Sequence, residues 1–174
     1  MAVPLFIFAA TACPFIKTGK PDEPEGKLRS VLEYRAGSQT SKLDEIYIFI
    51  LNQLLVHLTI PSDQMMKGFR VIIGSIIVLF DPLSTACLAQ LLQIPKRTID
   101  NMVCQLPSVM NIQSDKSAPV RPLHLSFRDF LLDSEKRQIN PFWVDEAETH
   151  ERLATKCLEL LLGSGHLKTN ICGI

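Results

Sequence analysis

Apolar residues recur at three- and four-residue intervals along much of the chain, which is the spacing of amphipathic helices. The clearest stripe lies within 42–58 and includes Leu43, Ile46, Tyr47 and Ile50. A helix is also expected over 5–16, where Pro14 should end or kink it. Further stripes and apolar runs predict helices over 27–35, 62–80, 84–92, 96–106, 126–133 and 143–162.

A different pattern follows the helix expected at 96–106. The stretch "SVMNIQSDKSAPVRPLHL", residues 108–125, has two alternating apolar runs around a polar turn, which predicts a β-hairpin. Helix, short helix, helix and hairpin is the element order of a winged helix, with the hairpin as its wing. The predicted fold is therefore mainly α, with a helical domain over 1–60, a winged helix over 61–134 and a further amphipathic helix within 135–174.

Polar residues at the starts of the expected helices are typical of caps. Ser84 is expected to cap the helix of 84–92, Ser126 the helix of 126–133, and Asp145 the last helix. The acidic residues Asp44 and Glu45 are expected at an exposed helix start for the same reason. Because capping explains these carboxylates, the sequence predicts no acid–base catalysis.

Charge and composition exclude several classes of protein. Lys plus Arg and Asp plus Glu both number 18, so an unspecific grip on nucleic acid, which needs excess positive charge, is disfavoured. The ten apolar residues 71–80 are too few for the roughly 20 that a membrane span needs. We expect a cytoplasmic protein with no metal site and with buried, reduced thiols at its five cysteines, Cys13, Cys87, Cys104, Cys157 and Cys172.

Two binding functions can be weighed from motifs. The fragment "KTGKP" fails as a phosphate loop, because that pattern needs glycine where Pro14 stands and Ser or Thr where Pro21 stands. The chain alone is therefore expected to hold no nucleotide cofactor and to be no enzyme. The helix at 96–106 would enter DNA in a winged-helix binder, but Lys96, Arg97 and Asp100 make a thin basic surface. DNA binding stays the alternative function.

The stretch "RPLHLSFRDFLLD", residues 121–133, places His124 where the second strand of the hairpin meets the next helix. Taken alone, His124 fits either a core histidine with a satisfied ring nitrogen or an imidazole that faces a ligand. Its apolar neighbours are all expected in the core: Leu123, Leu125, Phe127, Phe130 and Leu131.

Several segments together resemble a known family. They are "PLFIFAATACPFI", "LDEIYIFIL", "VIIGSIIVLFDPLS", "LAQLLQIP", "VRPLHLSFRDFLLD", "FWVDEAETHERLATKCLELL" and "NICGI". In this order they resemble the NACHT-type signalling ATPases of filamentous fungi, which include the vegetative-incompatibility proteins that carry WD-type repeats. That family belongs to the STAND class and is similar to animal NOD-like receptors. The resemblance covers nearly the whole chain.

The resemblance implies a regulatory part of a larger switch. It implies that residues 1–60 are the end of the nucleotide-binding core and the small helical domain, with the P-loop of the NTPase core upstream and with ADP or ATP and Mg in the complete protein. The helical and winged-helix part would sense the ADP-bound closed form and control activation and homo-oligomerisation, without catalysis of its own.

The resemblance also assigns roles to residues. It implies that His124 contacts the β-phosphate of ADP, because a histidine stands there in the family's H-x-SF-x-DFL pattern. The rest of the pattern is supplied by Ser126, Phe127, Asp129, Phe130 and Leu131. Pro4 and Leu5, followed by Phe6, stand where the family has Gly-Leu-Phe, which implies an adenine-side contact at Pro4 and Leu5.

Overall fold

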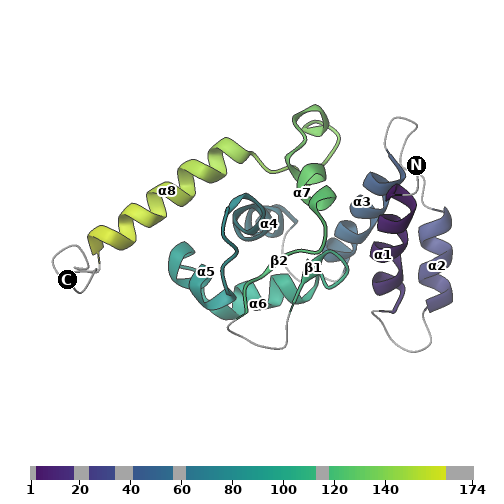
Figure 1. Ribbon diagram of the computed structural model, residues 1–174, viewed down its shortest axis with the longest axis horizontal. Helices are drawn as coiled ribbons and strands as arrows, with labels where there is room; N and C mark the ends of the chain where they lie inside the picture. Colours follow the sequence, from purple (N-terminus) through teal and green to yellow (C-terminus); the bar gives the residue numbers. More distant parts are fainter. Residues whose placement is uncertain (1–2, 18–23, 34–40, 57–61, 113–117, 164–174) are drawn as a thin grey trace.

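The computed structural model describes residues 3–17, 24–33, 41–56, 62–112 and 118–163. Within these ranges the chain is mainly helical, as predicted, with one small antiparallel sheet (Figure 1). The elements are α1 (Val3–Lys17), α2 (Pro24–Glu33), α3 (Lys42–Val56), α4 (Ser62–Val78), α5 (Thr85–Leu92), α6 (Lys96–Cys104), β1 (Met110–Asn111), β2 (Arg121–Pro122), α7 (Leu125–Leu132), the 3-10 turn η1 (Ser134–Lys136) and α8 (Glu146–Gly163).

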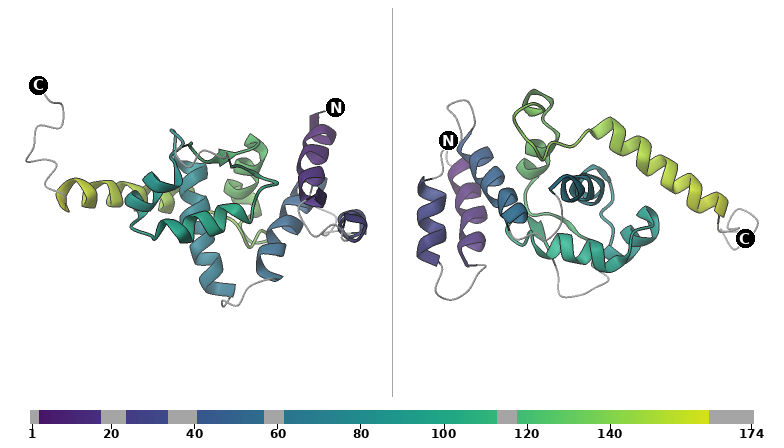
Figure 2. Two further views of the ribbon diagram at one scale, coloured as in Figure 1. Left: turned by 90° about the horizontal axis from the view of Figure 1, so that it is seen from below. Right: turned by 180° about the vertical axis from the view of Figure 1, so that it is seen from behind.

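Helix α4 lies at the centre of the arrangement. Figure 1 shows it end-on, with α5, α6, the hairpin, α7 and α8 around it. Helices α1, α2 and α3 lie side by side at one end of the molecule, while α8 extends toward the opposite end (Figure 2). A helix in this position has neighbours on most sides, which explains why residues 72–78 of α4 are all buried.

The predicted hairpin is confirmed, although its strands are shorter than the alternating sequence suggests. Strand β1 pairs antiparallel with β2, with Met110 opposite Pro122 and Asn111 opposite Arg121. A third extended segment, just before α5, joins them through a bridge between Ser84 and Pro119. The hairpin is therefore tied back to the helices and does not stand alone.

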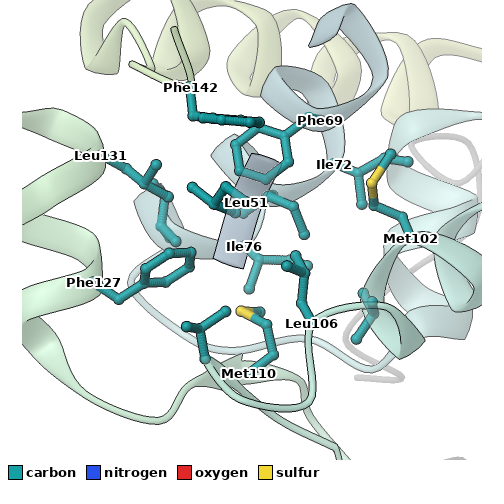
Figure 3. Packing of buried hydrophobic residues seen from close by; sticks show 14 of the residues in the cluster. Leu51, Phe69, Ile72, Ile76, Met102, Leu106, Met110, Phe127, Leu131 and Phe142 are labelled. Carbon is teal, nitrogen blue, oxygen red and sulfur yellow. The ribbon is translucent and has the colours of Figure 1, made fainter. Parts of the chain in front are cut away.

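One continuous apolar core joins residues from α1 to α8. Phe69 of α4 and Phe142, before α8, meet edge to face with ring centroids 5.3 Å apart. Figure 3 shows Phe127 and Leu131 of α7 directed toward Ile76 of α4. Each such buried side chain contributes about 1.5–3 kcal/mol of transfer free energy. The domain boundaries at 60/61 and 134/135 stay predictions.

Several expected elements need correction. Helix α1 continues past Pro14 to Lys17, so Pro14 does not end it. The four described cysteines, Cys13, Cys87, Cys104 and Cys157, are free but exposed, not buried; Cys172 lies outside the described residues. Among the described helices, none combines the length and the apolar character that a membrane crossing requires.

In the last helix, 143–162, helical spacing predicts one inward face made of Ala147, Leu153, Cys157 and Leu160, and the structure buries a different face. Leu153 is buried, but Ala147 and Cys157, which the spacing placed inward beside it, are exposed. Thr149 takes part in the buried face instead. The cause is that α8 packs on α4 and α5 from one side only, so a narrow stripe is enough to cover the contact.

Candidate functional site

His124 lies at the junction between the hairpin and α7. Its backbone is extended, with φ −145° and ψ 145°, and the helix begins at the next residue. The Ser126 amide donates to Nδ1 of His124 over 3.1 Å, so the imidazole caps the helix. The expectation that Ser126 is the cap was wrong, because Ser126 lies inside the first turn of α7.

The imidazole of His124 is exposed, which excludes the interpretation as a core histidine. The expectation that its two neighbours lie in the core was also wrong: Leu123 is 49% exposed and Leu125 is 70% exposed. An exposed imidazole and two exposed apolar side chains therefore occur at the residues that lead into α7.

A hydrogen-bonded chain connects the imidazole to the interior. The Ser126 hydroxyl lies 2.9 Å from Nδ1 of His124. The same hydroxyl lies 2.8 Å from the hydroxyl of Tyr47, which comes from α3 and is distant in sequence. His124 is thus held by two groups of Ser126, and Ser126 is held by Tyr47.

Tyr47 is almost completely buried, with 1% of its surface exposed. Its ring packs against Phe127 and Phe130 of α7, with centroids 5.2 and 5.3 Å away. Burial raises the pKa of the Tyr47 hydroxyl above 10.0, since the phenolate would lose its hydration, while hydrogen bonds with Ser126 and Thr11 act in the opposite direction. The hydroxyl is therefore neutral and available for hydrogen bonding.

Helix α7 is anchored to its other neighbours by Arg128. Its Nε donates to the backbone carbonyl of Ile77 in α4 over 3.0 Å. Its Nη2 donates to Glu146 at the start of α8 over 2.7 Å. A buried amide, Nδ2 of Asn140, adds a 3.1 Å bond to the carbonyl of Phe130. These bonds fix the orientation of the helix that carries His124 at its start.

A second contact between α3 and the segment after α7 is ionic. Nζ of Lys136 donates to Asp44 over 2.9 Å and to Asp133 over 3.1 Å. Asp44 also forms a capping box with Ser41, in which each side chain accepts from the other residue's amide. The expected capping role of Asp44 is confirmed, but the carboxylate is buried, not exposed.

The pKa values of this ionic cluster shift as its contacts require. Burial lowers the pKa of Lys136, but the hydrogen bonds to Asp44 and Asp133 outweigh burial, so the net pKa lies above 10.5. The hydrogen bond from Lys136 lowers the pKa of Asp133 below 3.8, and the Glu135 amide adds to this while burial opposes it. Both charged forms are thus stabilised in the fold.

The residues assigned by the family resemblance fall into three groups. Ser126 contacts His124 directly, while Asp129 is exposed on α7. The apolar members belong to the core, as expected: Phe127, Phe130 and Leu131. The adenine-side candidates, Pro4 and Leu5, belong to α1, but their side chains lie outside the described residues.

Two residues with contacts between α3 and the α7 region, Tyr47 and Lys136, were not among the expected site residues. Tyr47 was visible as a member of the α3 stripe, and a hydroxyl on a buried stripe requires a partner. No local pattern could identify that partner, because Tyr47 and Ser126 are separated by 79 positions.

Comparisons with known proteins add no assignment. No model of a protein family matches the chain, and neither a curated protein nor a solved structure is significantly similar to it.

Proposed function

We propose that this chain is the regulatory helical and winged-helix part of a NACHT-type STAND signalling NTPase, with no catalysis of its own. In this proposal His124 contacts the β-phosphate of ADP held by a P-loop core that other residues supply. The observation that carries the proposal is the exposed imidazole of His124, fixed at the junction of hairpin and helix.

The order and pairing of the elements support the winged-helix part of the proposal. Helices α4, α5 and α6 precede the hairpin, and the segment before α5 bridges to it through Ser84 and Pro119. This is the element order of a winged helix, which combines three helices, a short extended segment and a hairpin wing. In the proposal, α1 to α3 form the helical domain that precedes it.

The chemistry of the imidazole supports a phosphate contact. Nδ1 is occupied by Ser126, and no hydrogen bond of Nε2 occurs within the described part of the chain. A ligand holds a closed state only through contacts that the open state lacks. A donor carried on the winged helix, reaching a nucleotide on another domain, would be such a contact, and losing it would release the winged helix.

DNA binding is the alternative function, and the geometry of α6 argues against it. Nζ of Lys96 lies 2.6 Å from the Asp100 carboxylate, so one of the two basic residues of this helix is already paired within it. A DNA-binding protein would show salt-sensitive mobility shifts that Lys96→Ala plus Arg97→Ala abolishes. That result would favour the alternative and contradict the present proposal.

The decisive experiment uses the complete protein, joined to its P-loop core and loaded with labelled ADP. His124→Ala removes the proposed phosphate contact, worth about 1.5–3 kcal/mol for a hydrogen bond to a charged group, so ADP should dissociate roughly 10- to 100-fold faster. The matched control is His150→Ala, an exposed histidine on α8 that has no part in the proposal. Unchanged ADP retention in His124→Ala would overturn the proposed function.

A further inference from the structure

The backbone amide of Ser126 can only donate, and this fixes the donor and acceptor of each hydrogen bond around His124. The amide of Ser126 points at Nδ1 over 3.1 Å, so Nδ1 carries a lone pair and no proton. In a neutral imidazole the proton must then be on Nε2. A proton on Nδ1 would face the amide proton and break the cap of α7.

The same reasoning assigns donor and acceptor roles to the hydroxyls of Ser126 and Tyr47. Because Nδ1 carries no proton, its hydrogen bond with the Ser126 hydroxyl, 2.9 Å away, requires the hydroxyl to donate, and the hydroxyl and the amide of Ser126 then share the one lone pair of Nδ1. The Ser126 oxygen can then only accept from Tyr47, 2.8 Å away. The Tyr47 hydroxyl donates to Ser126 and, since it has one proton, accepts its remaining bond from Thr11.

We propose that Tyr47 is a positioning residue that acts through Ser126 to hold His124 as the Nε2–H tautomer. The chain thereby presents a single fixed N–H donor at the start of α7, suited to an anionic oxygen such as that of a phosphate. The identity of that acceptor rests on the proposed function, whereas the tautomer follows from the contacts within this chain.

The hydrogen-bonded chain from Tyr47 through Ser126 to His124, called the relay below, also couples the imidazole to the packing of α3 on α7. Tyr47 belongs to α3 and is enclosed by Phe127 and Phe130 of α7, so its hydroxyl reaches Ser126 only while the two helices are in contact. Separation of α3 from α7 would remove one of the supports of the tautomer. The exposed donor thus reports the state of the buried interface.

The test is nitrogen NMR of the 174-residue chain without nucleotide. Long-range proton–nitrogen spectra, recorded about two units above the ordinary histidine pKa of about 6.5, distinguish a protonated from an unprotonated ring nitrogen. His124→Gln identifies the resonances of His124. The wild-type ring should show two widely separated nitrogen signals with the proton on Nε2, whereas exposed His150 should show partly averaged ones.

Three variants separate the relay from general packing. Ser126→Ala should bring the two nitrogen signals of His124 closer together, and Tyr47→Phe should do so to a smaller degree, because the phenyl ring remains. Thr11→Val is the matched control: it removes the other hydrogen bond of Tyr47 but leaves the donation to Ser126, so the signals should stay at their wild-type positions. Melting curves establish that each variant is folded.

An averaged or Nδ1-protonated His124 in the wild-type chain would overturn the inference, and so would wild-type signals in Tyr47→Phe. These outcomes do not depend on nucleotide. If the tautomer is confirmed while His124→Ala retains ADP in the complete protein, the proposed function fails and the relay stands. If His124→Ala loses ADP in the complete protein but the nitrogen signals of His124 are averaged in the wild-type chain, the relay fails and the proposed function stands.

Discussion

Near the contact between α3 and α7, the side chain of Lys136 contacts two carboxylates. It donates to Asp44, whose side chain is 8% exposed, and to Asp133, whose side chain is 31% exposed. Replacing Lys136 would leave the buried carboxylate of Asp44 with the Ser41 amide as its one remaining hydrogen-bond donor among the described residues. A charge that loses its partner in this way is more costly than the net value of the pair.

We therefore predict that Lys136→Met lowers the free energy of unfolding by about 1–3 kcal/mol, measured by urea denaturation. The matched control is Lys96→Met, which breaks a pair whose side chains are both 38% exposed. Because solvent screens such a pair, its loss should cost less than about 1 kcal/mol. Equal effects of the two substitutions would contradict the structural role given to Lys136.

The same variant should alter the dependence of stability on pH. The pKa of Asp133 is lowered from 3.8, so its contribution is present above that value and is lost as the pH falls through the folded pKa. The pKa of Lys136 is raised from 10.5, so its contribution is lost as the pH rises above that value. Since Tyr47 also titrates at high pH, the acid side is the cleaner comparison: Lys136→Met should lose less stability than wild type below about pH 3.8.

For single residues, the sequence predicted which side chains are buried more reliably than which side chains contact one another. Phe127, Phe130 and Leu131 were correctly placed in the core, because apolar residues at helical spacing share a face. Leu123 and Leu125 were not, because each lies at an element end, where the period of the strand no longer applies and that of the helix has not begun. The cap was assigned to Ser126 because serine is the usual cap, whereas the chain uses the imidazole of His124.

At the scale of elements, the contact between α4 and the start of α8 depends on a glycine. A Cβ added at Gly74 would lie 3.0 Å from a methyl group of Val144. Val144 has little freedom to move, since it is β-branched and its amide donates to the carbonyl of Leu131 over 2.9 Å. By contrast, a Cβ at Gly68, in the same helix, would meet only the flexible end of Met102 at 3.7 Å.

These two glycines make a matched pair for the packing of α4 on α8. Alanine is favoured over glycine in a helix by about 0.8–1.0 kcal/mol, so Gly68→Ala should stabilise the chain by up to that amount. Gly74→Ala should instead destabilise it by about 1–3 kcal/mol, because the added methyl group overpacks the contact. The double variant Gly74→Ala plus Val144→Ala should cost less than the sum of its parts. Stabilisation by Gly74→Ala in thermal melts would contradict this packing.

The elements themselves were predicted with the fewest errors where a periodic apolar pattern begins at a capping residue. Ser84 caps α5 as expected, through its bond to the amide of Cys87, and Asp145 caps α8 through the amide of Glu148. The helix expected at 5–16 is present as α1, but the expectation that Pro14 ends it was wrong, because helical backbone continues past Pro14 to Lys17; the alternative of a kink at Pro14 stays a prediction. How the elements pack, including the bridge between Ser84 and Pro119, depends on contacts between distant segments that no local pattern contains.

At the scale of the whole molecule, mainly helical architecture followed from the patterning, whereas the arrangement around α4 did not. The proposed site is one face of this arrangement, and it offers the nucleotide a single side chain. No group of three or more His, Cys, Asp or Glu side chains that could hold a metal ion occurs in the described ranges. The chain is thus proposed to read a nucleotide that it does not itself retain.

This leads to a prediction about the chain in isolation. One hydrogen bond to a charged group contributes about 1.5–3 kcal/mol, whereas a dissociation constant of 1 μM requires about 8.2 kcal/mol. Micromolar ADP should therefore leave the melting temperature of the 174-residue chain unchanged, since the stabilisation RT ln(1 + [ADP]/Kd) is negligible when Kd greatly exceeds the ligand concentration. The chain should also release no phosphate from ATP. His124→Ala is the matched control and should melt identically with and without ADP. A clear shift in the wild-type chain would mean that a complete phosphate site lies within these residues, and the division of roles between this region and a separate P-loop core would then be wrong.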